Sequence, residues 1–135
     1  MLSRSKIALL LFMLPFAPAG AQPLLLDVPT TVLGVDVACT GVSLDAREEP
    51  RWAAYTLRVE FAGEGGRYLG GETVTLRQDG KVLFSGSCDG SWLLFRLPAG
   101  RYQVEAALDG QTATSSAIVP ATGQACVILR YPTGG

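Results

Sequence analysis

The stretch that decides the fold is Ala53-Ala54-Tyr55-Thr56-Leu57-Arg58-Val59-Glu60-Phe61, in which every odd-numbered residue is apolar and most even-numbered ones are polar. Successive side chains of a strand point to opposite faces, so this period of two predicts a strand with one buried face. An amphipathic helix would instead place apolar residues three and four positions apart. Residues 53–61 are therefore expected to form a strand that covers a core on one side.

The segments that follow repeat this alternation and are separated by turns. Asp79-Gly80 and Asp109-Gly110 supply the positive φ that a two-residue hairpin loop needs, so each is expected to join two strands. The further expected strands are Thr73 to Gln78, Lys81 to Ser87, Trp92 to Leu97, Arg101 to Leu108, Gln111 to Val119 and Ala125 to Tyr131. Since no crossover helices lie between them, the sequence predicts an all-β, antiparallel sandwich of about seven strands.

The strand register after Asp79-Gly80 stays open at this point. A strict two-residue loop pairs Leu76 with Leu83 and turns Val82 and Phe84 outward, whereas a bulge reverses this.

The segment before residue 53 has a weaker pattern. Residues 22–52 are expected to be an extended segment wrapping the sandwich or to add one or two short strands, with a possible short helix over Leu44 to Glu49. Ser43 suits the N-cap of that helix, Asp45 suits the positive end of its dipole, and Pro50 cannot continue it. The sandwich is expected over residues 53–131, followed by a tail of residues 132–135.

Residues 1–21 have the three parts of a cleavable secretion signal. Arg4 and Lys6 precede the apolar run Ile7 to Leu14, and Ala19-Gly20-Ala21 matches a small-x-small cleavage site. The apolar run is shorter than the roughly 20 residues that span a bilayer. No Cys follows it directly, so no lipid anchor is expected. Cleavage after residue 21 predicts a periplasmic or secreted protein without a membrane anchor.

Charge and length exclude several functions. Removing residues 1–21 takes away two of the eleven basic residues and none of the twelve acidic ones, which leaves 114 residues with a net charge of −3. Nucleic-acid binding needs a basic surface that displaces counterions, and anionic membranes attract polybasic segments, so neither partner is expected. A chain of this length suits one domain.

The cysteines indicate one disulfide. Cys39 and Cys88 both lie in loop-like settings, and Cys126 lies inside an expected strand. Because loops adjust more easily to disulfide geometry, and export favours oxidation, a Cys39–Cys88 bridge is expected. The alternative is that all three are small buried apolar residues. No Cys-x-x-Cys pair supports a redox role.

Residues 97–106 read Leu-Pro-Ala-Gly-Arg-Tyr-Gln-Val-Glu-Ala, with Asp79-Gly80 before them and Gly110 after them. This pattern resembles the carboxypeptidase regulatory-like domain. The likeness covers about residues 54–131. Three further segments belong to it and are similar to small exported proteins of proteobacteria: Tyr55 to Ala62, Tyr68-Leu69 and Asp89 to Leu94. The resemblance implies a transthyretin-like, immunoglobulin-like sandwich. It implies no activity, since one fold hosts many functions.

Catalysis is not expected. The chain contains no His, which removes the commonest general base and the most used ligand of catalytic zinc. The hydroxyisourate hydrolases related to transthyretin use histidines and a C-terminal Tyr-Arg-Gly-Ser, whereas this chain ends Arg130-Tyr131-Pro132-Thr133-Gly134-Gly135. Asp45 with Glu48, or Glu48 with Glu49, are carboxylate pairs better explained as a solvated face. No catalytic residue, metal ligand or cofactor is therefore predicted.

Two tryptophans are the residues weighed for ligand binding. Trp52 and Trp92 could stack on sugars or anchor a protein partner if they are exposed. Trp92 is otherwise a core residue at a strand start, and Trp52 a lid on a sheet. The leading hypothesis is a non-catalytic exported module that binds another envelope or secreted protein through a sheet edge or loop end. Glycan binding is the alternative, and a transthyretin-like hydrolase comes third.

Overall fold

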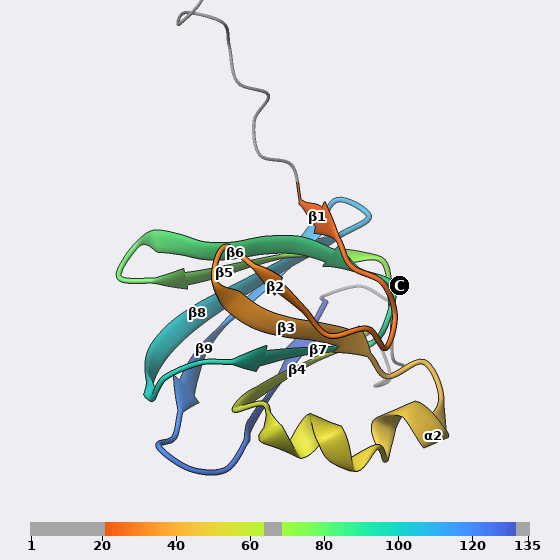
Figure 1. Ribbon diagram of the computed structural model, residues 1–135. Coiled ribbons are helices and arrows are strands. Elements are labelled where there is room, and N and C mark those ends of the chain that lie inside the picture. Colours follow the sequence, from red (N-terminus) through yellow and green to blue (C-terminus); the bar gives the residue numbers. More distant parts are fainter. Residues whose placement is uncertain (1–20, 64–68, 132–135) are drawn as a thin grey trace, which may run out of the picture.

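The computed structural model describes residues 21–63 and 69–131. The expected secretion signal, apart from Ala21, and the expected tail of residues 132–135 lie outside these described residues. The described part is an all-β sandwich of two five-stranded sheets, which confirms the predicted fold class (Figure 1).

The described residues form ten strands rather than about seven. The first sheet has the order β1-β6-β5-β8-β9, and the second has the order β10-β4-β7-β3-β2. Both sheets are mixed rather than wholly antiparallel, because β1 pairs with β6, and β10 with β4, in parallel. The strands are β1 (Gln22–Pro23), β2 (Thr30–Val32), β3 (Val35–Thr40), β4 (Leu57–Ala62), β5 (Glu72–Gln78), β6 (Lys81–Cys88), β7 (Trp92–Arg96), β8 (Gly100–Leu108), β9 (Gln111–Val119) and β10 (Ala125–Arg130).

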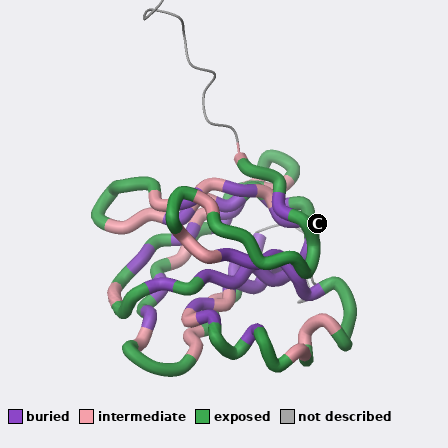
Figure 2. Tube along the Cα trace, in the orientation of Figure 1, coloured by how far each residue is buried: buried purple, intermediate pink, exposed green. Residues whose placement is uncertain are grey.

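The core lies between the inward faces of the two sheets. Phe61, Phe84 and Phe95 are fully buried there. The rings of Phe84 and Phe95 meet edge to face across the sheets, with centroids 5.1 Å apart. In Figure 2 the buried parts of the trace follow the strands and the exposed parts follow the turns and the N-terminal segment. The predicted alternation therefore does place one face of each sheet in a common core.

The strand expected over residues 53–61 begins later than predicted. Pro50–Ala54 form a 3₁₀ helix, and β4 begins at Leu57. Proline is favoured in the first turn of a helix because its φ is fixed and it needs no hydrogen-bond donor there. Ala53 is consequently exposed, whereas Leu57, Val59 and Phe61 are buried as predicted.

Residues 22–52 contribute three strands to the two sheets. β3 lies between β7 and β2, so this segment supplies an interior strand of the second sheet. The expected short helix is present as α2 (Leu44–Arg47), and the Ser43 Oγ caps it by accepting a hydrogen bond from the Ala46 N–H at 3.1 Å. Figure 1 shows α2 and the 3₁₀ helix on the outer side of the second sheet.

The register after Asp79-Gly80 is decided by a bulge. Both turn residues have positive φ, at 52° and 77°, as a two-residue hairpin requires. Arg77 pairs with Val82, but Leu76 pairs with Phe84, so the bulge lies between these two pairs. Phe84 therefore turns into the core, while Val82, on the loop side of the bulge, stays 45% exposed.

The disulfide joins the two sheets. Cys39 of β3 is bonded to Cys88 of β6, with their Cα atoms 5.6 Å apart, which confirms the predicted pair. Both residues are fully buried. Cys126 is a free, exposed thiol in β10. The alternative of three unpaired, buried cysteines is therefore wrong.

Candidate functional site

Exposed apolar side chains gather between β1 and β3. Leu25, Val28 and Leu33 are 72%, 47% and 78% exposed. All three line one groove of about 440 Å³, together with Leu24 and Val32. We call Leu25, Val28 and Leu33 the N-terminal apolar patch. Apolar side chains that cluster at a surface groove, rather than being scattered singly, are typical of interaction sites.

The loop that carries Leu25 and Val28 is fixed to both sheets. The Leu24 N–H donates to the Ser87 carbonyl at 3.0 Å, and the Asp27 N–H donates to the Cys39 carbonyl at 2.8 Å. The Asp27 carboxylate also accepts a hydrogen bond of 2.5 Å from the Thr40 hydroxyl. Because these bonds hold the backbone, binding a partner would order the two side chains but not the loop that carries them.

Leu33 occupies a backbone position that leucine disfavours. Leu33 and Gly34 form the two-residue turn between β2 and β3, with φ of 54° and 82°. The Asp79-Gly80 and Asp109-Gly110 turns have nearly the same φ values but begin with Asp. A left-handed residue other than Gly, Asn or Asp costs about 1–2 kcal/mol. Since its side chain is 78% exposed, burial does not offset this cost.

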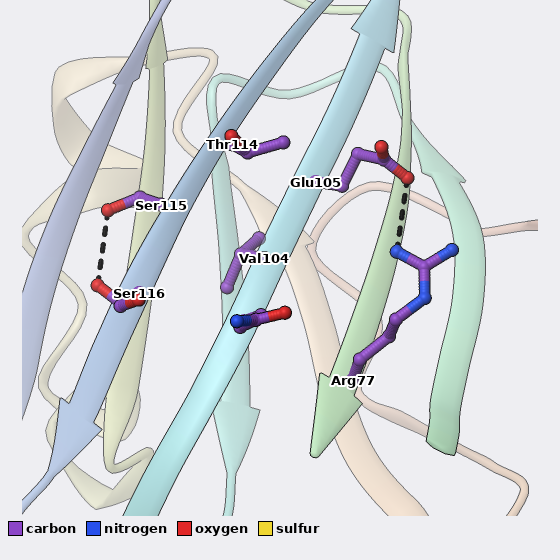
Figure 3. Close-up of a pocket in the computed structure, with 7 residues that line it drawn as sticks. Arg77, Val104, Glu105, Thr114, Ser115 and Ser116 are labelled. Atoms are coloured by element: carbon purple, nitrogen blue, oxygen red, sulfur yellow. Dashed lines mark hydrogen bonds and ion pairs between the residues drawn. The ribbon is translucent and has the colours of Figure 1, made fainter. Parts of the chain in front are cut away.

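A polar groove of about 290 Å³ lies on the outer face of the first sheet, over β5, β8 and β9. The Arg77 guanidinium pairs with the Glu105 carboxylate at 3.1 Å across β5 and β8. Figure 3 shows this pair, with Thr114 and Ser116 projecting from β9. Exposed ion pairs of this kind contribute about 0–1 kcal/mol, so the groove is a polar surface and not a preorganised charged site.

The two tryptophans are buried. Trp52 is 3% exposed, and its Nε1 donates to the Ala46 carbonyl at 2.7 Å, so it is a lid on the second sheet, packed with Ala38, Tyr55 and Leu94. Trp92 is 9% exposed and lies under the Arg58 guanidinium, 4.3 Å from the ring centroid. Neither ring offers the open face that sugar stacking needs.

Cys126 has polar neighbours but no activated thiol. Its Sγ donates to the Glu60 carboxylate at 3.2 Å, and Arg58 Nη2 lies 3.5 Å from the sulfur. Burial, and then the hydrogen bond to Glu60 and the charge of that carboxylate, raise the pKa of the Cys126 thiol. A reactive cysteine needs a lowered pKa, so the geometry gives no nucleophile here.

Glu72 is a buried carboxyl that the sequence reasoning missed. It points inward at the start of β5, is fully buried, and has no well-formed hydrogen bond within residues 21–63 and 69–131. Burial, with a smaller contribution from Asp89, raises the pKa of Glu72 to about 9. Burial, and then Glu72, raise the pKa of the nearby Tyr131 phenol as well. Glu72 is therefore protonated at neutral pH. Its signal in the sequence is a charged residue in phase with the inward Val74 and Leu76.

The carboxylates weighed as acid and base do not form a site. Asp45 and Glu48 are exposed, and Glu49 pairs with Arg51 at 2.6 Å. In the part of the chain that the structure describes, no group of three or more His, Cys, Asp or Glu side chains is placed to hold a metal ion. None of the described helices has the length and apolar character to cross a membrane.

Comparison with known proteins gives no family assignment. No protein-family model matches the chain, and no curated protein matches it either.

Proposed function

We propose that this protein is a non-catalytic, exported interaction module that binds another envelope or secreted protein through the N-terminal apolar patch. The single observation that carries the proposal is that Leu33 combines an exposed side chain with a left-handed backbone conformation. The chain places an exposed leucine at a left-handed turn position where folding favours Asp, Asn or Gly. A residue that costs folding free energy and is held toward solvent is best explained by a contact that it makes with a partner.

Export is supported by two independent features. Residues 1–21 have the pattern of a secretion signal. The Cys39–Cys88 disulfide suits an oxidising compartment, such as the periplasm or the extracellular space.

Membership of the carboxypeptidase regulatory-like family is part of the proposal. The sandwich fold supports it, and so does one contact inside the motif of residues 97–106. The Tyr102 hydroxyl donates to the Pro98 carbonyl at 2.7 Å. This bond gives the Pro and the Tyr of the motif a structural role at the start of β8. A shared fold carries no activity with it, so the function rests on the surface of this chain.

The other two hypotheses have less support. Glycan binding rested on exposed tryptophans, and Trp52 and Trp92 are buried. A transthyretin-like hydrolase uses histidines, and this chain has none.

Replacing Leu33 with Asn is expected to separate stability from binding. Asn tolerates positive φ, so Leu33→Asn raises the free energy of unfolding by about 1 kcal/mol. The same change removes an apolar contact of the patch, and capture of the partner falls at least tenfold, about 1.4 kcal/mol. Urea denaturation measures the first effect, and affinity capture from an envelope extract, followed by mass spectrometry, measures the second.

Leu44→Gln is the matched control, because Leu44 is 65% exposed on α2 and does not line the groove. It is expected to capture the same proteins as the unchanged chain. Equal capture by Leu33→Asn and the unchanged chain would show that the patch is not the binding surface.

A further inference from the structure

β9 is a long sheet edge without the usual protection. Within the described residues it pairs with β8 alone, in an uninterrupted register from Gln111 to Val119. Its sequence, Gln-Thr-Ala-Thr-Ser-Ser-Ala-Ile-Val, contains no charge and no Pro, and the ladder contains no bulge. Proteins normally blunt an exposed edge with one of these devices, because a bare edge pairs with other chains.

The other edges of the two sheets differ. β1 has two residues and β2 has three, while β10 has six and includes Arg130. β9 has nine. It is therefore the edge best suited to receive another strand, and it lies at the end of the first sheet opposite to β1 (Figure 1).

The register shows which backbone groups of β9 are free. The two-residue Asp109-Gly110 loop closes on the pair of Leu108 and Gln111, so odd-numbered residues of β9 bond to β8. The N–H and C=O groups of the even-numbered residues then point away from β8. Ser115 Oγ donates to the Ser116 carbonyl at 3.1 Å, as expected for a carbonyl that has no strand partner (Figure 3).

We propose that β9 pairs antiparallel with β9 of a second copy of this chain, about a two-fold axis at Ser115. This register places Thr114 opposite Ser116 and Thr112 opposite Ile118. All the paired residues are uncharged, so the edge is complementary to itself, as a two-fold interface must be. The free even-numbered groups give about eight backbone hydrogen bonds.

The side chains of β9 do not obstruct a second copy. On the inward side Ala113 lies opposite Ala117 of the other copy, and both are small and buried in the core of their own sandwich. On the outer face the pairing covers Ile118, which is 64% exposed. The two first sheets become one continuous sheet, and the polar grooves of the two copies come to lie side by side.

This interface goes beyond the proposed function, because it uses the opposite edge from the N-terminal apolar patch. A dimer joined at β9 leaves both patches free. It therefore presents two binding sites to a partner, which raises the apparent affinity for a partner that is itself repeated on a surface.

The test is a sedimentation series over protein concentration, with Cys126→Ser in every sample to prevent a covalent dimer. Interfaces below about 1,200 Å² are weak, so the average mass is expected to rise with concentration toward twice that of one chain. Thr114→Lys puts a charge on the edge and is expected to weaken dimerisation at least tenfold. Thr75→Lys is the matched control. Thr75 and Thr114 both pair with Glu105, but Thr75 lies on the interior strand β5, so this variant is expected to dimerise like the unchanged chain.

Circular dichroism checks that both lysine variants are folded, and amide exchange identifies the interface. We expect exchange at Thr112, Thr114, Ser116 and Ile118 to slow as concentration rises. A chain that stays monomeric throughout the series, or a dimer unaffected by Thr114→Lys, would overturn the proposal. Neither result bears on the apolar patch, which the capture experiment tests separately.

Discussion

Glu72→Gln is expected to stabilise the protein by about 3 kcal/mol at pH 7. The Glu72 pKa is about 9 in the folded chain and 4.5 in the unfolded chain. The folded state therefore holds a proton that the unfolded state releases above pH 4.5. Stability from this group is fully present below pH 4.5 and is lost as pH rises toward 9. Gln has nearly the same shape and does not ionise, so the variant does not show this loss.

The measurement is urea denaturation of both proteins between pH 4 and pH 9. The difference between them is expected to be near zero at pH 4 and to grow steadily above pH 4.5. Asp89 and Tyr131 face Glu72 and are present in both proteins, so the difference isolates this carboxyl. Glu105→Gln, at a side chain that is 39% exposed, is the control for a carboxyl at the surface. A difference that stays constant over this range would contradict a buried, protonated Glu72.

Removing the disulfide is expected to cost about 4 kcal/mol. Cys39 and Cys88 are 49 residues apart, and a bridge that closes a loop of this length restricts the unfolded chain by about that amount. Small domains have a total stability of about 5–15 kcal/mol, so the loss is a large share of it. Denaturation of the Cys39→Ala/Cys88→Ala double variant measures the cost directly.

Cys126→Ala is the control for the double variant, because Cys126 is exposed and unbridged. It is expected to change the free energy of unfolding by less than about 0.5 kcal/mol. If the double variant were as stable as this control, the bridge would not be a main restraint on the unfolded chain.

The strands from β5 to β10 could be predicted because their alternation and turn residues agree. Asp79-Gly80 and Asp109-Gly110 have the chemistry of the turns that they form. The bulge in β6 could not be predicted, because the same loop permits either register and the burial of Phe84 decides between them. Pairing of β10 in parallel with β4 depends on contacts distant in the sequence, which local alternation does not encode.

The N-terminal apolar patch was missed for a related reason. Val32-Leu33-Gly34-Val35 has no Asp or Asn to signal a turn, so the β2–β3 hairpin resembles a continuous apolar run. Leu33 is the residue that makes the turn unrecognisable in the sequence. Leu33 is also the residue that makes this turn a candidate binding site. Local rules fail at this position because the side chain does not serve the fold, as is common at functional positions.

The disulfide was predicted because the two cysteines lie near turns in a chain that is expected to be exported. Glu72 was not singled out, since one charged residue at the start of a strand is usually solvated. Its burial follows from the packing of β5 against the second sheet.

The most direct test of the proposed function is site-specific photo-crosslinking in intact cells, with a photoreactive residue at position 33 or, as control, at position 44. Leu33 and Leu44 are similarly exposed, at 78% and 65%, but only Leu33 lines the groove of the N-terminal apolar patch. We predict an adduct with one envelope or secreted protein from position 33 and none from position 44. No adduct from position 33, or the same adducts from both positions, would contradict a docking site at the N-terminal apolar patch.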